Sequence, residues 1–251
     1  MTQPQDRKLL FLYLDIDHAT EYKYQQHPDE WKTAFEFFFE DFPDYLKEAQ
    51  QTLFGKFKVP PLAPMNFWKA LGDGQVYNAP FQTADQAYLY TKAFYNATVL
   101  FNGFFSKRFG LFVKAVGWYA SLPTINLCIQ TPAGEDYLGP DLDIGFRLAA
   151  EALSQRMILA MDLAYELSYS AYAQEMDFYH LGWRKLKGVA KDKPYPILMI
   201  TGRNKPELPI WETYLNDLTQ AYINGEPISA EGLRSLIDRY KKDLHFNASQ
   251  I

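Results

Sequence analysis

The chain has 251 residues, of which 48% are hydrophobic and 22% charged, and its formal net charge is -5 at pH 7. This composition predicts one globular domain with an appendage, and the acidic balance argues against a partner that is nucleic acid or an anionic membrane. The single cysteine, Cys128, excludes an intrachain disulfide and a cysteine-based zinc site. No apolar run approaches the ~20 residues of a membrane span, and no apolar signal core follows Met1, so we expect a cytoplasmic protein.

The first predicted element is a buried strand, because residues 8–15 form a short apolar run that ends at Asp15. A helix is predicted from Pro28 to about Phe54, with acidic residues in its first turn. We expect Pro43 to kink or break this helix, because proline has no backbone N–H to donate.

A tight hairpin is predicted next. Residues 66–71 and 75–78 are strand-like, and the Gly-Asp-Gly sequence centred on Asp73 contains the Asp-Gly dipeptide that is typical of such turns. The following helix is expected to run from its N-cap, Thr83, to Phe105.

The second half of the chain alternates between strand-like and helical segments. Residues 111–120 and 125–130 are strand-like, and 131–134 read as a turn. The segment from Asp143 to about Ala173 is rich in Ala, Leu and Met and predicts one long helix. The remaining predicted elements are a last core strand at 196–201 and helices near 211–222 and 229–244.

This order of elements predicts an α+β fold. A hairpin interrupts the alternation of strands and helices, which favours a ferredoxin-like α/β sandwich with helices on one face of a mostly antiparallel sheet. We expect residues 1–204 to form the main domain and residues 205–251 to form a C-terminal helical extension.

Two aspartates stand out by their positions. Asp15 ends a buried strand and Asp73 lies at the tip of the hairpin, so both carboxylates reach one edge if these elements are neighbours in the sheet. Two facing carboxylates repel each other unless a cation lies between them, and oxygen ligands suit Mg²⁺ or Mn²⁺. On spacing alone, the alternative is that Asp15 only ends a strand and Asp73 only fills a turn.

Four segments in chain order resemble the motifs of class III nucleotidyl cyclases. Each motif is weak alone, and their order from residue 8 to residue 201 makes the set more specific. In the third segment, Gly139 is followed four residues later by Asp143 and eight later by Arg147, the spacing of the family's motif. The segments are KLLFLYLDIDHAT (8–20), FWKALGDGQVYNAP (67–80), EDYLGPDLDIGFRLAAEAL (135–153) and WRKLKGVAKDKPYPILMI (183–200).

The resemblance implies a cyclase catalytic domain at residues 1–204 and a role for each matched residue. Asp15 and Asp73, with the backbone of Ile16, would bind two Mg²⁺ or Mn²⁺ ions per site. Lys69 and Asp136 stand at the positions that recognise the base.

Further positions would bind the rest of the nucleotide. Arg147 would stabilise charge on the transferring phosphate, and Lys187 would hold the phosphate tail, for which Arg184 and Lys185 are also candidates. Asp143 stands near the ribose, and Thr20 belongs to the substrate-binding positions.

The resemblance also implies a homodimer with two composite active sites. One protomer would supply the metal-binding aspartates and its partner the contacts to base and phosphate, so an isolated protomer would have no complete site.

The sequence departs from the family's pattern at two places. The usual Gly-Phe-Thr after the first Asp-Ile is replaced by His18-Ala19-Thr20, preceded by Asp17. The usual amide of the third motif is Asp143, and an ionised acid cannot donate a hydrogen bond to ribose as an amide can. Both departures bear on ribose positioning and on the choice of base.

The two substrate indications conflict. Lys69 with Asp136 looks like the adenine-reading pair of adenylate cyclases. Residues 139–147 look more like the stand-alone pyrimidine cyclases of bacterial Pycsar antiphage defence, whose product, cyclic UMP or cyclic CMP, activates a separate effector protein. Aromatic side chains near the motifs either narrow a base pocket or pack in the core: Phe67, Trp68 and Tyr137.

The sequence therefore favours a cyclase acting on UTP or CTP. The alternatives are an adenylate cyclase that makes cyclic AMP, an inactive cyclase homologue that only binds a nucleotide, and an unrelated α+β scaffold.

Overall fold

A computed structural model describes residues 7–57, 62–190, 193–202 and 225–248. The strands are β1 (Arg7–Ile16), β2 (Asn66–Leu71), β3 (Gly74–Phe81), β4 (Val113–Leu122), β5 (Leu127–Thr131), β6 (Gly134–Leu138), β7 (Met157–Leu159), β8 (Met176–Lys185), β9 (Pro194–Gly202) and β10 (Glu226–Ile228). The helices are α1 (Ala19–Gln25), α2 (Pro28–Phe57), α3 (Ala84–Phe109), α4 (Pro140–Ala149), α5 (Met161–Leu167), the 3₁₀ turn η1 (Ala173–Glu175) and α7 (Ala230–Ala248). None of the helices in the described ranges is long and apolar enough to cross a membrane.

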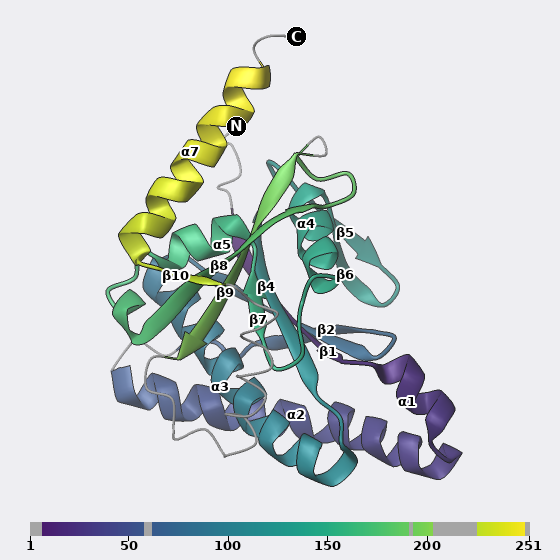
Figure 1. Cartoon of the computed structure of the whole chain (residues 1–251). Coiled ribbons are helices and arrows are strands. Elements are labelled where there is room, and N and C mark those ends of the chain that lie inside the picture. Colours follow the sequence, from purple (N-terminus) through teal and green to yellow (C-terminus); the bar gives the residue numbers. More distant parts are fainter. Residues whose placement is uncertain (1–6, 58–61, 191–192, 203–224, 249–251) are drawn as a thin grey trace.

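The described strands form one large sheet and a separate β5–β6 hairpin (Figure 1). The strand order of the large sheet is β10-β8-β9-β7-β4-β1-β3-β2, and all its neighbours are antiparallel except β4 and β7. The predicted α+β fold with a mostly antiparallel sheet is confirmed.

Strand β1 lies in the interior of the sheet and is buried on both faces. On one face, Leu12 lies beside Tyr77, whose ring contacts phenylalanines of α2 and α3. On the other face, Phe11 stacks on Trp118, against which Gly145 of α4 packs closely. Helices therefore cover both faces, and the prediction of helices on one face is wrong. The uninterrupted apolar run of β1 reflects this double burial.

Helix α2 runs unbroken through Pro43. Of the two outcomes expected there, a break is wrong, and a kink stays a prediction. Phe38, Phe42 and Leu46 lie on one buried face that spans the proline. Their packing against the sheet and α3 offsets the cost of about 3 kcal/mol that an interior proline imposes on a helix.

The long helix predicted from Asp143 to Ala173 is also wrong. The chain leaves α4 at Ala149, forms β7 and enters the short α5. Strand β7 is fully buried between β4 and β9, where its backbone groups pair with both neighbours. A short apolar run such as Met157–Leu159 does not distinguish a buried strand from a helix, so tertiary pairing decided between them.

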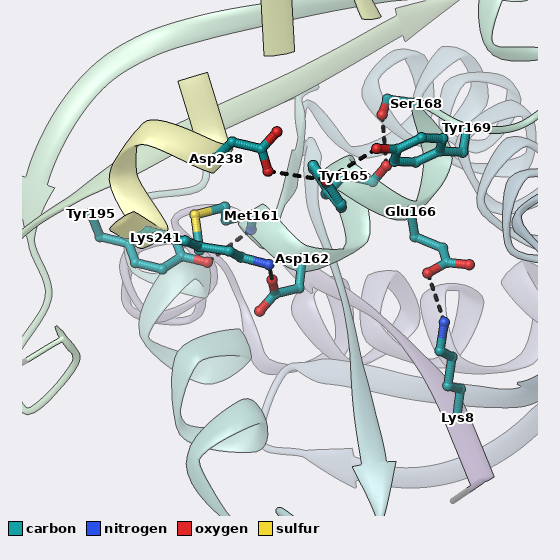
Figure 2. A network of polar contacts seen from close by, with 10 residues as sticks. All are labelled: Lys8, Met161, Asp162, Tyr165, Glu166, Ser168, Tyr169, Tyr195, Asp238 and Lys241. Atoms are coloured by element: carbon teal, nitrogen blue, oxygen red, sulfur yellow. Dashed lines mark hydrogen bonds and ion pairs between the residues drawn. The ribbon is translucent and has the colours of Figure 1, made fainter. Parts of the chain in front are cut away.

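The C-terminal part of the described chain packs onto the main domain. Strand β10 pairs with β8. Helix α7 is the helix predicted at 229–244, and it lies against α5. Figure 2 shows this contact, in which Lys241 Nζ is 2.6 Å from Asp162 Oδ1. The helix predicted near 211–222 lies outside the described residues, and the division of the chain at residue 205 stays a prediction.

Candidate active site

The end of β1 and the β2–β3 turn bring two predicted metal ligands together. Asp15 pairs with Gly74 across the sheet, and the backbone N–H of Ile16 donates to the carbonyl of Asp73 at 3.3 Å. The predicted hairpin therefore lies directly beside the end of the first strand, and both aspartates reach the same edge of the sheet.

The Asp15 carboxyl occupies a partly buried, electrostatically unfavourable place. Its side chain is 16% exposed, and its Oδ1 is buried without a hydrogen-bond partner among the described residues. Burial, and then the negative charge of Asp73, raise the pKa of Asp15 to about 6, against the opposing effects of Lys114 and the Tyr13 hydroxyl. The positive charge near Asp15 is therefore too small to offset the burial of its carboxylate and the negative charge of Asp73.

Tyr13 supports Asp15 from the same face of β1. A Cβ at position 74 would overlap the Tyr13 ring, so glycine there gives the ring room beside the hairpin. The Tyr13 hydroxyl lies close to the Asp15 carboxyl, and burial together with Asp15 raises the pKa of the phenol.

Lys114 is a site residue that sequence reasoning missed. It lies opposite Asp15 on β4, and its Nζ is 3.5 Å from Asp15 Oδ2 and 3.6 Å from Asp17 Oδ1. The available signal was a lysine within the apolar strand VKAVGWYASL, but its partner depends on the register of β1 and β4. This lysine only partly offsets the charge of the acids.

These residues fit a divalent cation that draws further ligands from a substrate. The described residues hold no cluster of three or more Asp, Glu, His or Cys side chains suited to a metal. They do offer two adjacent carboxylates, one with an unpaired buried oxygen, and such oxygens are the ligands that Mg²⁺ prefers while substrate phosphates complete its shell.

The structure also joins the two residues predicted to read the base. Lys69 Nζ on β2 is 2.7 Å from Asp136 Oδ1 on β6, and each side chain is 32% exposed. Lys69 lies 3.9 Å from the centre of the Trp68 ring, whose N–H donates to the carbonyl of Glu135 at 3.0 Å. Burial favours protonation of Asp136, but the bonds from Lys69 and from the Tyr137 N–H outweigh it and lower the pKa of the Asp136 carboxyl.

The aromatic residues near this pair divide between core and surface. Tyr137 is buried, and its ring contacts both Trp68 and Phe11, so its main role is in packing. Phe67 is largely exposed on β2. Trp68 is half-buried: its ring contacts the core residue Phe11 and also lies against Lys69.

The remaining predicted residues lie at the surface. Asp143 and Arg147 are exposed on α4. Glu151, four residues after Arg147, lies 3.7 Å from Arg184. Lys187 is exposed in the turn after β8.

Thr20 is exposed on α1, beyond the end of β1. Within the described parts of one chain, no hydrogen bond or ion pair joins the acid pair to the Lys69–Asp136 pair. The structure thus brings the candidate residues together in separate groups, and their roles stay predictions.

Comparisons with known proteins relate this fold to nucleotide cyclases. No protein-family model and no curated protein sequence matches the chain. Among solved structures, the adenylyl cyclase CyaB from P. aeruginosa matches with a TM-score of 0.55 at 13% identity, over 80% of this chain and 97% of that one.

Two further cyclase domains are similar to a comparable extent. The guanylate cyclase domain of RhGC from Catenaria anguillulae, in complex with GTP, matches with a TM-score of 0.56 at 10% identity, over 80% of this chain and 100% of that one. The non-canonical dimeric guanylyl cyclase domain of RhoGC from Blastocladiella emersonii matches with a TM-score of 0.54 at 8% identity, over 80% and 99%. The chain therefore has the fold of class III cyclase catalytic domains.

Proposed function

We propose that the chain is a nucleotidyl cyclase that converts UTP or CTP to the 3′,5′-cyclic monophosphate and pyrophosphate. The observation that carries the proposal is the adjacency of Asp15 and Asp73 at one sheet edge of a cyclase fold, with a buried oxygen of Asp15 left unpaired among the described residues. A fold by itself does not imply an activity, so the argument rests on this site.

The proposed reaction is an in-line displacement at the α-phosphorus. The ribose 3′-oxygen bonds to that phosphorus, the bond to the bridging oxygen of pyrophosphate breaks, and the proton of the 3′-hydroxyl passes to water. Two Mg²⁺ or Mn²⁺ ions held by Asp15, Asp73 and the Ile16 backbone would supply positive charge to the attacking and leaving oxygens.

The chain's own cations complete the proposed site. Arg147 has a planar fork that can bind two oxygens of the transferring phosphate, where charge spreads during the reaction. It is exposed and its neighbour Glu151 is engaged elsewhere, so it is available to a substrate. Lys187 would bind the leaving phosphates, while Asp143 and Thr20 would position the sugar.

We propose that each site is built from two protomers. The acid pair and the Lys69–Asp136 pair are separate groups within the described chain. A two-fold dimer would place one protomer's acids opposite its partner's base-reading pair and Arg147 and would create two equivalent sites. A cyclase domain of similar fold is described as dimeric.

A pyrimidine is the favoured base, and the aromatic side chains packed on one side of the base-reading pair support it. Trp68 lies under Lys69, and Tyr137 and Phe11 pack behind Trp68. This arrangement and the resemblance of residues 139–147 support UTP or CTP, with a cyclic product that acts on a separate effector in antiphage defence.

Adenylate cyclase activity is the second candidate. The 2.7 Å contact of Lys69 with Asp136 is the arrangement expected of an adenine-reading pair, and an adenylyl cyclase is among the structures of similar fold.

A single screen separates these candidates. The purified full chain is incubated with Mn²⁺ and, separately, with ATP, GTP, UTP and CTP, and cyclic product and pyrophosphate are quantified by mass spectrometry and a coupled assay. We expect catalytic efficiency with UTP or CTP to exceed that with ATP at least ~10-fold, a difference of ~1.4 kcal/mol. Equal or better turnover of ATP would favour the adenylate cyclase over the pyrimidine cyclase. If the wild type forms no more product from any triphosphate than a D73N control, the chain would be a nucleotide-binding protein without cyclase activity.

A further inference from the structure

Lys114 occupies the place beside the acids where a cation is expected. Its Nζ lies 3.5 Å from an Asp15 oxygen and 3.6 Å from an Asp17 oxygen, and its side chain is only 19% exposed. The register of β1 and β4 sets Lys114 directly opposite Asp15, so the backbone of two central strands holds the lysine there.

Lys114 brings one positive charge to Asp15 and Asp17, which together carry two negative charges when ionised. Its ammonium reaches one Asp15 oxygen and leaves Oδ1 unpaired among the described residues. A divalent cation bound at the same carboxylates would stand close to the ammonium, and like charges in a partly buried site repel strongly. Lys114 and a metal ion therefore compete for the same negative charge.

A nucleoside triphosphate removes this competition. Its phosphates bring enough negative charge to accommodate the metal ions and the ammonium together, and a lysine is a compact, rotatable donor to phosphate oxygens. The competition between Lys114 and metal ions is therefore strongest while no phosphate is present.

We propose that Lys114 is a resident counter-charge that weakens metal binding in the nucleotide-free protein, so that metal ions load with the triphosphate. Lys114 is a positioning residue in this proposal, which rests on the proposed metal site of Asp15 and Asp73. It makes metal affinity depend on nucleotide, and removing the lysine breaks that dependence.

The test measures binding of Mn²⁺ to the full chain by the EPR signal of free Mn²⁺, with and without a UTP analogue that cannot cyclise because it lacks the 3′-hydroxyl. Without nucleotide, we expect K114M to bind Mn²⁺ about tenfold more tightly than wild type. K114R keeps the charge and should behave as wild type. K107M removes an exposed lysine of α3 and serves as the matched control. Adding the analogue should increase the affinity for Mn²⁺ less in K114M than in wild type.

The outcomes separate this inference from the proposed function. If wild type binds Mn²⁺ with the analogue but K114M binds it no more tightly than wild type without nucleotide, Lys114 does not compete with metal and the inference fails alone. If no variant binds Mn²⁺ in either condition, the metal site itself is wrong and both proposals fail. Thermal unfolding checks each variant, and K114Q, which keeps a polar side chain, replaces K114M if the latter does not fold.

Discussion

Lys69 and Asp136 are 67 residues apart in the chain, yet Lys69 Nζ lies 2.7 Å from Asp136 Oδ1. One comes from the edge strand of the main sheet and the other from the separate β5–β6 hairpin, so this contact ties the hairpin to the sheet. The lysine also lies over the Trp68 ring. A polar pair held on an aromatic surface is suited to reading the edge of a base by hydrogen bonds.

Replacing either member of this pair should reduce turnover or base selectivity more than stability. We expect K69M and D136N each to lower kcat/KM for the preferred triphosphate by about 10- to 100-fold, because a base-reading site loses discrimination when one partner is missing. The pair is one-third exposed, so the loss of unfolding free energy should stay within about 1 kcal/mol. Kinetics with all four triphosphates and urea unfolding check this, and a purely structural pair would show the opposite balance.

The aspartates can be tested by removing one charge at a time. D15N and D73N should each abolish cyclisation, with a loss of at least ~100-fold, while the protein remains folded. Removal of a charge from a repelling pair should slightly favour folding of the metal-free protein. D29N, on the exposed first turn of α2, is the matched control and should keep full activity. Near wild-type rates for D15N or D73N with saturating Mn²⁺ would contradict the metal assignment.

Sharing of the site between protomers predicts complementation. D73A and R147A homodimers should both be inactive, and an equal mixture should form about half heterodimers, each with one intact composite site. Recovered activity should therefore approach about one quarter of the wild-type value at equal total protein. Subunit exchange is followed with differently tagged chains. Exchange without any recovery would show that each site belongs to one chain.

The raised pKa of Asp15 predicts an unusual pH dependence of stability in the metal-free protein. With a folded pKa of about 6, Asp15 keeps a proton that the unfolded chain has lost between about pH 4 and pH 6. Its stabilising contribution is full below that window and is lost as the pH rises through it. We expect wild type to lose up to about 2 kcal/mol relative to D15N between pH 4 and pH 7, after allowing for solvent screening. Denaturant unfolding in EDTA measures this, and a pH-independent difference would contradict the shift.

Gly145 links the packing of α4 to the position of Arg147. A Cβ at residue 145 would overlap the indole of Trp118, a fully buried side chain that also stacks on Phe11. G145A should therefore destabilise the fold by about 1–3 kcal/mol and move α4 away from the sheet. Activity should fall with it because α4 carries Arg147. G55A, at an α2 glycine with open space around it, is the control and should be neutral or stabilising. Unchanged stability of G145A would show that α4 adjusts without cost.

Local sequence patterns determined much of this fold. The apolar run that ends at Asp15, the Asp-Gly hairpin around Asp73 and the Thr83 cap all appear in the structure where they were predicted, and Thr83 accepts a hydrogen bond from the N–H of Gln86. Each of these signals depends on residues only a few positions apart, so the sequence alone contains it.

Only the tertiary structure decided what depends on distant neighbours. Burial between β4 and β9 made residues 157–159 a strand where helix propensity predicted otherwise, and packing on both sides of Pro43 kept α2 continuous. The lysine beside the acids was missed for the same reason. Lys114 meets Asp15 because of the register of two strands nearly 100 residues apart in the chain, and a register is fixed by the pairing of whole strands rather than by any local pattern.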